Sequence, residues 1–224
     1  MSLESGELIK CPRCGKGSEF IAWKSLNSAL NPEAKADLVS GKLFVFKCPH
    51  CGAGCNVDYG MLYHQMDDKI MIHYALNDEE ETEVIESFEK MSSGEMARSV
   101  GISLVEEGYT FRVVRSQNQL REKIVIFDNK LDDRVIEVMK LFLISHLSES
   151  NSELEIENLF LEANESGPEH FAIQLKDGNW GSTAYIPDLY ESIRNDIFKD
   201  SDDGKSEYIV NCQWALDKIN SLNK

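Results

Sequence analysis

The residues of this sequence best suited to chemistry are the cysteines of two short motifs, CPRCG at residues 11–15 and CPHCG at residues 48–52. Two residues separate the cysteines within each motif, so both sulfurs of a pair can turn toward one ion at about 2.3 Å, and a second pair completes a tetrahedron. The proline inside each motif fixes φ, and the glycine after it permits the positive φ that metal-binding turns often need. We therefore predict a zinc site formed by Cys11, Cys14, Cys48 and Cys51.

Two alternatives to a metal site are a redox-active Cys-x-x-Cys pair and a set of unrelated buried thiols. A redox protein needs only one such pair, and neither pair here precedes an obvious helix. The start of the sequence, MSLESGELIK, lacks the basic residues and apolar core of a signal peptide, and no apolar stretch approaches the ~20 residues that span a bilayer. We expect a cytoplasmic protein without membrane association, in a reducing environment where disulfides rarely persist.

The remaining candidate ligands and carboxylates have simpler interpretations. Cys55 has the wrong spacing for either motif and is expected to be a small core residue or a free thiol. His50 is expected to point outward, and the other two histidines of this region, His64 and His73, to be hydrogen-bonded structural residues. Cys212 is in helical step with Ile209, Leu216 and Ile219, which predicts a buried helix face. Asp132 and Asp133 are expected to be helix caps.

Charge is distributed unevenly along the 224 residues. Residues 1–76 hold 8 Lys/Arg and 8 Asp/Glu, whereas residues 77–224 hold 15 and 31 and account for the whole net charge of −16. An acidic surface repels phosphate backbones, and the first part lacks a cluster of basic and aromatic residues, so we expect no nonspecific nucleic-acid binding.

The order of predicted elements indicates an α+β fold in three parts. Residues 1–76 are predicted to be a zinc-ribbon-like β-module with strands at 20–26, 43–47, 56–59 and 70–74 and an inserted helix from Pro32 to Gly41, with Asn31 as N-cap. Residues 77–150 are predicted to form a helix or disordered acidic connector at 77–91, a strand at 109–114, and helices at 118–127 and 131–147. Residues 151–224 are predicted to form a β-meander at 154–160, 170–176 and 180–186, then helices at 187–198 and 208–222. In the longer helix of the middle part the expected buried side is Leu131, Val135, Val138 or Met139, Phe142 and Leu147.

Several segments together resemble the CpXC domain family of bacteria and archaea, which is named for its two Cys-Pro-x-Cys motifs. They are CPRCG, the stretch from Asn31 to Gly41, LFVFKCPHCG, VDYGMLYHQMDDKIMIHY, LREKI and LDDRVIEVMK. The resemblance runs from about Leu8 to Leu147 and implies a zinc-binding module. It supplies no substrate.

Phosphate-binding, metalloprotease, serine-hydrolase and deaminase motifs are absent from the sequence, which leaves an enzyme unsupported. The favoured interpretation is a structural zinc in a β-module, with the acidic remainder offering a surface to a protein partner. The alternatives are a zinc ribbon that binds nucleic acid and a zinc-dependent or thiol-dependent enzyme.

Overall fold

A computed structural model describes residues 2–92, 108–151, 153–164, 166–199, 204 and 207–222 of the chain. The chain forms two compact units, Met1–Arg121 and Glu122–Lys224, and each is described by itself. Their helices and strands confirm the predicted α+β class. The predicted division at residues 76 and 150 stays a prediction. The boundary between the two compact units lies between Arg121 and Glu122.

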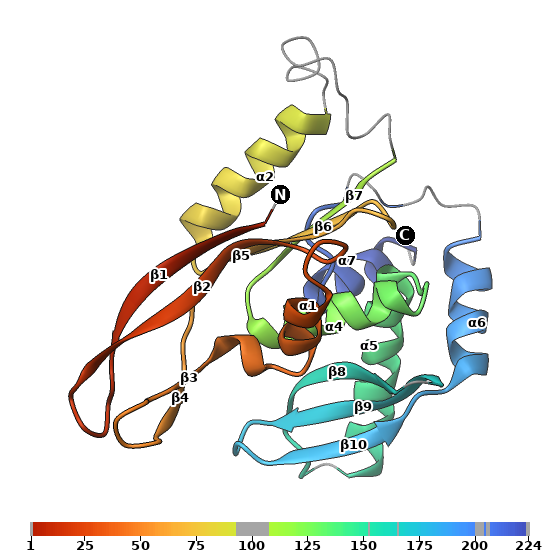
Figure 1. Cartoon of the computed structure of the whole chain (residues 1–224). Helices are drawn as coiled ribbons and strands as arrows, with labels where there is room; N and C mark the ends of the chain where they lie inside the picture. The colour runs from red at the N-terminus through yellow and green to blue at the C-terminus, as the bar shows by residue number, and fades with distance from the viewer. Residues whose placement is uncertain are drawn as a thin grey trace. The chain divides into compact units, whose positions relative to one another are not determined.

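The first unit is built on a five-stranded sheet with the strand order β1-β2-β5-β6-β7 (Figure 1). Its strands are β1 (Leu3–Lys10), β2 (Gly17–Asn27), β5 (Met61–Gln65), β6 (Ile70–Tyr74) and β7 (Thr110–Val114). The β2–β5 and β6–β7 pairs are parallel, and the β1–β2 and β5–β6 pairs are antiparallel. Along β5 and β6 every second side chain is buried, which is the period of a strand with one face on a core.

A short helix and a small hairpin follow β2. They are α1 (Pro32–Val39), a 3-10 turn η1 (Lys42–Phe44), and the paired strands β3 (Val45–Lys47) and β4 (Gly54–Asn56). The predicted strand at 43–47 therefore begins with a 3-10 turn, and the strand predicted at 56–59 lies at 54–56 instead. Asn31 occupies the N-cap position of α1, but its side chain makes no capping bond and accepts a hydrogen bond from the Ser2 hydroxyl at 2.6 Å. Gly41 ends the helix region with a φ of +78°, as expected for glycine.

The acidic segment after β6 is helical, which rules out a disordered connector for α2 (Asp78–Ser92). Four acidic residues occupy its first turn, where the helix dipole favours negative charge. Phe88 is buried, and its ring lies 4.7 Å from that of Phe111 on β7. The apolar contact of Phe88, together with polar contacts from Glu80 to His73 and from Glu81 to Arg115, thus holds α2 on the sheet.

The second unit contains a three-stranded antiparallel sheet in the order β10-β9-β8, which confirms the predicted meander. Its strands are β8 (Ile156–Asn164), β9 (Gly167–Leu175) and β10 (Trp180–Ala184), and its helices include α5 (Asp133–Ser150), α6 (Pro187–Ile197) and α7 (Cys212–Leu222). The helix α4 (Gln117–Asp128) crosses from the first unit into the second. The core of the second unit is formed by apolar side chains of these helices and of β8 and β9, among them Val135, Met139, Leu159, Phe171 and Ile193.

Two predicted buried faces in this unit are partly wrong. Phe142 is 47% exposed on α5, although Val135, Val138 and Met139 are buried as expected. The helix α7 begins at Cys212, which is exposed, and buries Ala215. Among the described helices, none is long and apolar enough to cross a membrane.

Candidate metal centre

The two cysteine motifs form turns of the same construction, one joining β1 to β2 and the other joining β3 to β4. In the first turn the amide of Cys11 donates to the Lys16 carbonyl at 3.0 Å, and the amide of Gly15 donates to the Cys11 carbonyl at 2.9 Å. The second turn repeats both bonds, from Cys48 to Ala53 at 2.8 Å and from Gly52 to Cys48 at 2.9 Å. The matching bonds show that each turn fixes its two cysteines through the backbone.

Glycine ends both turns for a conformational reason. Gly15 and Gly52 each have a φ of +71°, in the left-handed region that costs other residues about 1–2 kcal/mol. A Cβ atom added at either position would meet nothing within 4 Å. The requirement for glycine therefore comes from the backbone alone, as the sequence predicted.

The four motif cysteines lie together, with all Sγ atoms within 4.8 Å of one another. The two shorter contacts join one turn to the other: Cys11 to Cys51 at 3.6 Å and Cys14 to Cys48 at 3.7 Å. A tetrahedron with metal–sulfur bonds of about 2.3 Å has sulfur–sulfur edges of about 3.8 Å, whereas a disulfide bond measures about 2.05 Å. The four thiols are free and could hold one metal ion.

The crowded thiols shift one another's acidity in opposite directions. The backbone amide of Cys14, followed by that of Arg13, lowers the pKa of the Cys11 thiol to about 6 against the opposing effect of burial. The amide of Ala53 lowers the pKa of Cys51, but burial and the neighbouring thiols together raise it to about 12. Without a cation, four adjacent thiolates repel one another, and a bound divalent ion removes that obstacle because it favours deprotonated ligands.

The packing around the cysteines is small. Cys11, Phe46 and Cys48 are its buried members, and Ile9, Phe20, Cys51, Ala53, Cys55 and Val57 pack against them partly buried. The Phe20 ring lies 6.4 Å from Phe46 and 5.9 Å from Tyr59, a buried residue outside this group. So few buried side chains supply little hydrophobic stabilisation of the two turns.

The other candidates of this region take structural positions. Cys55 is half-buried beside the four thiols and outside their group, and His50 is exposed. His64 Nε2 lies 3.0 Å from the Tyr109 hydroxyl, and burial lowers the pKa of this histidine. His73 Nε2 lies 3.2 Å from a Glu80 carboxylate oxygen. Both histidines are hydrogen-bonded, as expected.

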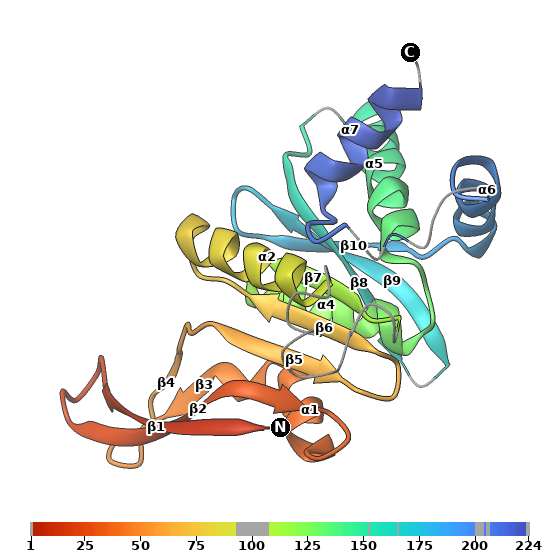
Figure 2. The same ribbon diagram turned by 90° about the horizontal axis from the view of Figure 1, so that it is seen from above.

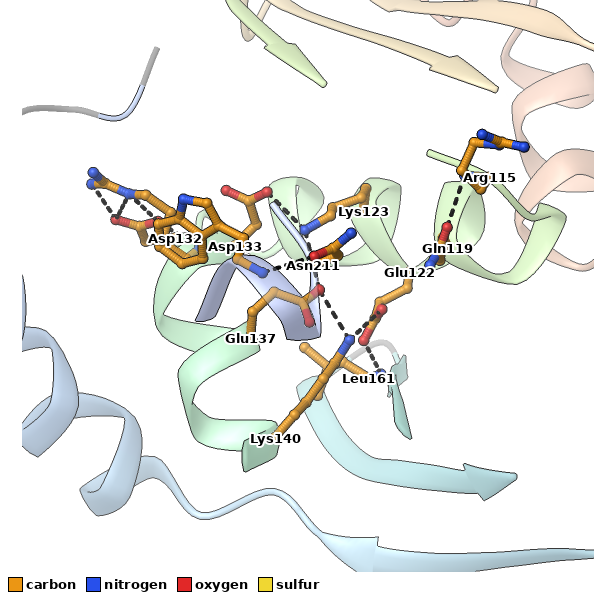
Figure 3. A network of polar contacts seen from close by, with 12 residues as sticks. Arg115, Gln119, Glu122, Lys123, Asp132, Asp133, Glu137, Lys140, Leu161 and Asn211 are labelled. Atoms are coloured by element: carbon orange, nitrogen blue, oxygen red, sulfur yellow. Dashed lines mark hydrogen bonds and ion pairs between the residues drawn. The ribbon is translucent and has the colours of Figure 1, made fainter. Parts of the chain in front are cut away.

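The sequence reasoning missed a second cluster, in the second unit, which we call the buried charge network (Figure 3). Its members are Glu122, Lys123, Asp133, Glu137 and Lys140, each at most 5% exposed. Lys140 Nζ donates to Glu122 at 2.6 Å and to Glu137 at 3.1 Å. Lys123 Nζ donates to Asp133 at 2.8 Å and to Glu137 at 3.2 Å. Both buried cations are thereby paired.

Glu122 joins this network to the sheet. One of its carboxylate oxygens accepts the backbone N–H of Leu161 at 2.7 Å, on strand β8 at the edge of the meander. Burial raises the pKa of Glu122 above its ordinary value, and Lys140 opposes the shift. The same carboxylate thus satisfies a strand amide and a buried lysine.

The neighbouring aspartates do not share one role. Asp132 is the N-cap of α5 and accepts the amide of Arg134 at 2.9 Å, as predicted. Asp133 lies in the first turn of α5, as expected of an acid that complements the helix dipole, but it is also 1% exposed and pairs with Lys123, which was not predicted. A signal was present in the sequence: Asp133, Glu137 and Lys140 follow the i, i+4, i+7 spacing of a helix face.

Comparison with known proteins gives one significant result. The model of the family described as CpXC protein matches residues 9–140, a range that includes the four motif cysteines and the whole buried charge network. No curated protein and no solved structure matches significantly. Because the match spans more than half of its length, the chain belongs to the CpXC family.

Proposed function

We propose that Cys11, Cys14, Cys48 and Cys51 bind one zinc ion in a closed structural site. The observation that carries this proposal is the sulfur spacing of 3.6 and 3.7 Å between the turns, close to the edge of a zinc–sulfur tetrahedron. Tetrahedral sites of four thiolates are typical of zinc, with iron as the competitor for the same ligands. We expect this chain to be in a reducing environment, which keeps such thiols from forming disulfides and leaves them free to bind a metal.

A site with four thiolates stabilises the fold and does not activate a substrate. Catalytic zinc sites usually have three protein ligands and leave the fourth position to water. Here the four cysteines fill the tetrahedron, and their charge makes the metal a weak Lewis acid. The two turns need the metal for their own stability, because only three side chains of the described cluster around them are buried. Metal binding contributes directly to the folding free energy of such small modules.

On this basis the first unit is a metal-stabilised module whose role is protein interaction. Two hairpin ends held together by one ion present a rigid surface, which favours recognition because little conformational freedom is lost on binding. Binding of nucleic acid by the same hairpin ends is the second candidate function, and a single-stranded DNA that binds to these ends would support it.

Metal analysis of the purified full chain tests the site. We expect one zinc per chain after expression in zinc-replete cells and less than half of that in Cys14→Ser or Cys48→Ser. Cys55→Ser is the matched control, because it makes the same chemical change beside the four thiols and outside their group. A wild-type chain without zinc, or a Cys55→Ser chain that loses as much metal as Cys14→Ser, contradicts the proposal.

Cobalt substitution tests whether the shell is closed. A cobalt-loaded chain is expected to show a tetrahedral sulfur-ligand spectrum that azide does not change. A spectrum that shifts with azide would show an open coordination position and favour an enzyme instead. Amide hydrogen exchange adds a structural measurement: chelation should accelerate exchange at Cys11, Gly15, Cys48 and Gly52, whose amides form the two turns.

A further inference from the structure

The turns that carry the cysteines have a charge opposite to that of the chain. Lys10, Arg13 and Lys16 surround the first motif, Lys47 precedes the second, and all four side chains are exposed. No Asp or Glu occurs in residues 8–18 or 38–57. We call Lys10, Arg13, Lys16 and Lys47 the basic tip. It belongs to a chain with a net charge of −16.

The charges of the basic tip are available for a partner. Within the described part of the chain, none of its four side chains takes part in an ion pair. A zinc ion with four thiolates adds about −2 beneath them, so the tip remains positive by about two charges. Because the metal joins the two turns, it also holds the cations of one turn beside that of the other.

A complementary surface lies on α2 of the same unit. Glu79, Glu83 and Glu86 are exposed at the i, i+4, i+7 spacing of one helix face, whereas Phe88 turns to the sheet. Among the described residues, Glu79 and Glu83 have no ion pair, and Glu86 has one, with Lys90 at 3.7 Å. We call Glu79, Glu83 and Glu86 the acidic stripe. At a rise of 1.5 Å per residue it is about 10 Å long.

Within one chain the two surfaces do not meet. Figures 1 and 2 show α2 well apart from the ends of the β1–β2 and β3–β4 hairpins in both views of the first unit. The helix α2 packs on β7, at the opposite edge of the sheet from β1, and its Glu80 side chain reaches His73 on the neighbouring strand β6. Each chain therefore offers both halves of an electrostatic contact and uses neither internally.

We propose that the basic tip of one chain binds the acidic stripe of a second copy. This inference rests on the proposed zinc site, because the metal is what assembles the tip. A second copy is favoured because both charged surfaces are present on the same chain and have opposite signs. The remaining acidic charge opposes association weakly at physiological ionic strength, where interactions beyond about 8 Å are largely screened. Complementary patches of this kind determine which surfaces meet and how they are oriented.

Nucleic acid fits the tip less well than an acidic helix. Binding of single strands relies on aromatic side chains on which bases stack. The aromatic side chains nearest to the turns are not available for this, because Phe46 is buried and Phe20 packs against it.

A charge-swap experiment with the full chain tests the proposal. Sedimentation equilibrium at 0.1 M salt is expected to show concentration-dependent dimers or higher species of the wild-type chain. A tip variant, Lys10→Glu with Lys16→Glu, and a stripe variant, Glu83→Lys with Glu86→Lys, are each expected to raise the dissociation constant at least about tenfold. The equimolar mixture of the two variants should regain the association, because acidic tips then face basic stripes. This mixed pair has the same total charge as a wild-type pair.

Controls separate the contact from its alternatives. Lys24→Glu with Lys176→Glu changes net charge as much as the tip variant, at exposed lysines outside the tip, and should leave the dissociation constant within about twofold. A monomeric wild-type chain, or variants that fail to complement each other when mixed, overturns the proposal. So does salt-sensitive binding of a 20-mer single-stranded DNA that the tip variant loses while self-association is unaffected.

Zinc content distinguishes the two proposals. Every variant should retain one zinc per chain, since none of the substitutions removes a cysteine. A chain that holds zinc and stays monomeric contradicts only the contact between copies, whereas a chain without zinc contradicts the metal site itself. Cys14→Ser is expected to lose zinc and self-association together.

Discussion

Replacing Lys140 with methionine probes the buried charge network most directly. Lys140 is 5% exposed, donates to Glu122 at 2.6 Å and to Glu137 at 3.1 Å, and its pKa is raised because these carboxylates outweigh the effect of burial. Methionine keeps most of the volume and removes the charge. The substitution leaves Glu122 without a cationic partner, while Lys123 still pairs with Glu137.

The size of the loss follows from what the orphaned carboxylate can do. Removing one partner of a buried ion pair typically costs about 3–5 kcal/mol. Glu122 can instead take up a proton. A carboxyl with an ordinary pKa of 4.5 that stays protonated at a higher pH costs about 1.4 kcal/mol for each pH unit between 4.5 and that pH, here pH 7. Over this interval of about 2.5 units, protonation limits the loss to about 3.4 kcal/mol. We therefore expect Lys140→Met to destabilise the second unit by about 3 kcal/mol at pH 7.

The pH dependence has a definite sign. Burial raises the pKa of Glu122, and loss of Lys140 removes the main influence that lowers it. A carboxyl whose pKa is raised by folding binds more protons in the folded chain than in the unfolded chain. Its contribution to stability therefore falls as pH rises above about 4.5. The loss caused by Lys140→Met should thus shrink to about 1 kcal/mol at pH 5.

Urea unfolding followed by circular dichroism at 222 nm, at pH 5 and pH 7, measures this difference. The matched control is the double variant Lys140→Met with Glu122→Gln, in which the amide oxygen of the glutamine can still accept the Leu161 N–H. It should recover about 2 kcal/mol at pH 7, since no carboxylate is then left unpaired. Equal losses at both pH values, or a double variant no more stable than the single one, would refute this reasoning.

Three further predictions concern single residues. Gly15→Ala should destabilise the zinc-loaded chain by about 1–2 kcal/mol in urea, because alanine is strained at a φ of +71°; Gly54→Ala, which lacks a positive φ, should cost clearly less. Asp132→Ala should lower the melting temperature of the second unit more than Asp132→Asn, since asparagine still caps the helix, at about 1 kcal/mol per cap, whereas both variants lose the carboxylate that pairs with the buried Arg134 at 2.8 Å; equal losses would assign the effect to this ion pair alone. Burial raises the pKa of Glu80, but the backbone amide of Leu76 and the side chain of His73 lower it by more, so an NMR titration should give a pKa below 4.5. The stabilising effect of Glu80 is then lost as pH falls through that pKa. A measured pKa of 4.5 or above would contradict this prediction.

The grouping of the four motif cysteines could be predicted because its determinants are local. The spacing within each motif determines how its two sulfurs can turn toward one another. The glycine that follows each motif predicts a positive φ, which the structure confirms at Gly15 and Gly52. Which of the four cysteines are buried was not predictable. Cys11 and Cys48, the first cysteines of the two turns, are buried, while Cys14 is exposed, because burial depends on how the hairpins pack on Phe46.

The strands were predicted less completely than the helices. Two were missed: β1, in which polar residues predominate because it forms an edge, and β5, whose buried face ends in Gln65. Gln65 is 5% exposed and accepts a hydrogen bond from the Tyr63 hydroxyl at 2.9 Å. A buried amide with a partner breaks the apolar alternation by which a strand is recognised, although the structural period of two is intact.

The buried charge network shows why a hydrophobic pattern alone could not complete the second unit. All eight residues from Asp133 to Lys140 are buried, so the first two turns of α5 are covered on every side and the charged side chains there have no outward face. Such burial is tolerable only where opposite charges of another helix lie within hydrogen-bonding distance, and here α4 supplies Glu122 and Lys123. When two consecutive helices each carry opposite charges at the spacing of a buried helix face, this pattern is therefore evidence that the two helices are in contact. The pairing of α4 with α5 could have been inferred from this compensation of charge, which a count of apolar residues does not detect.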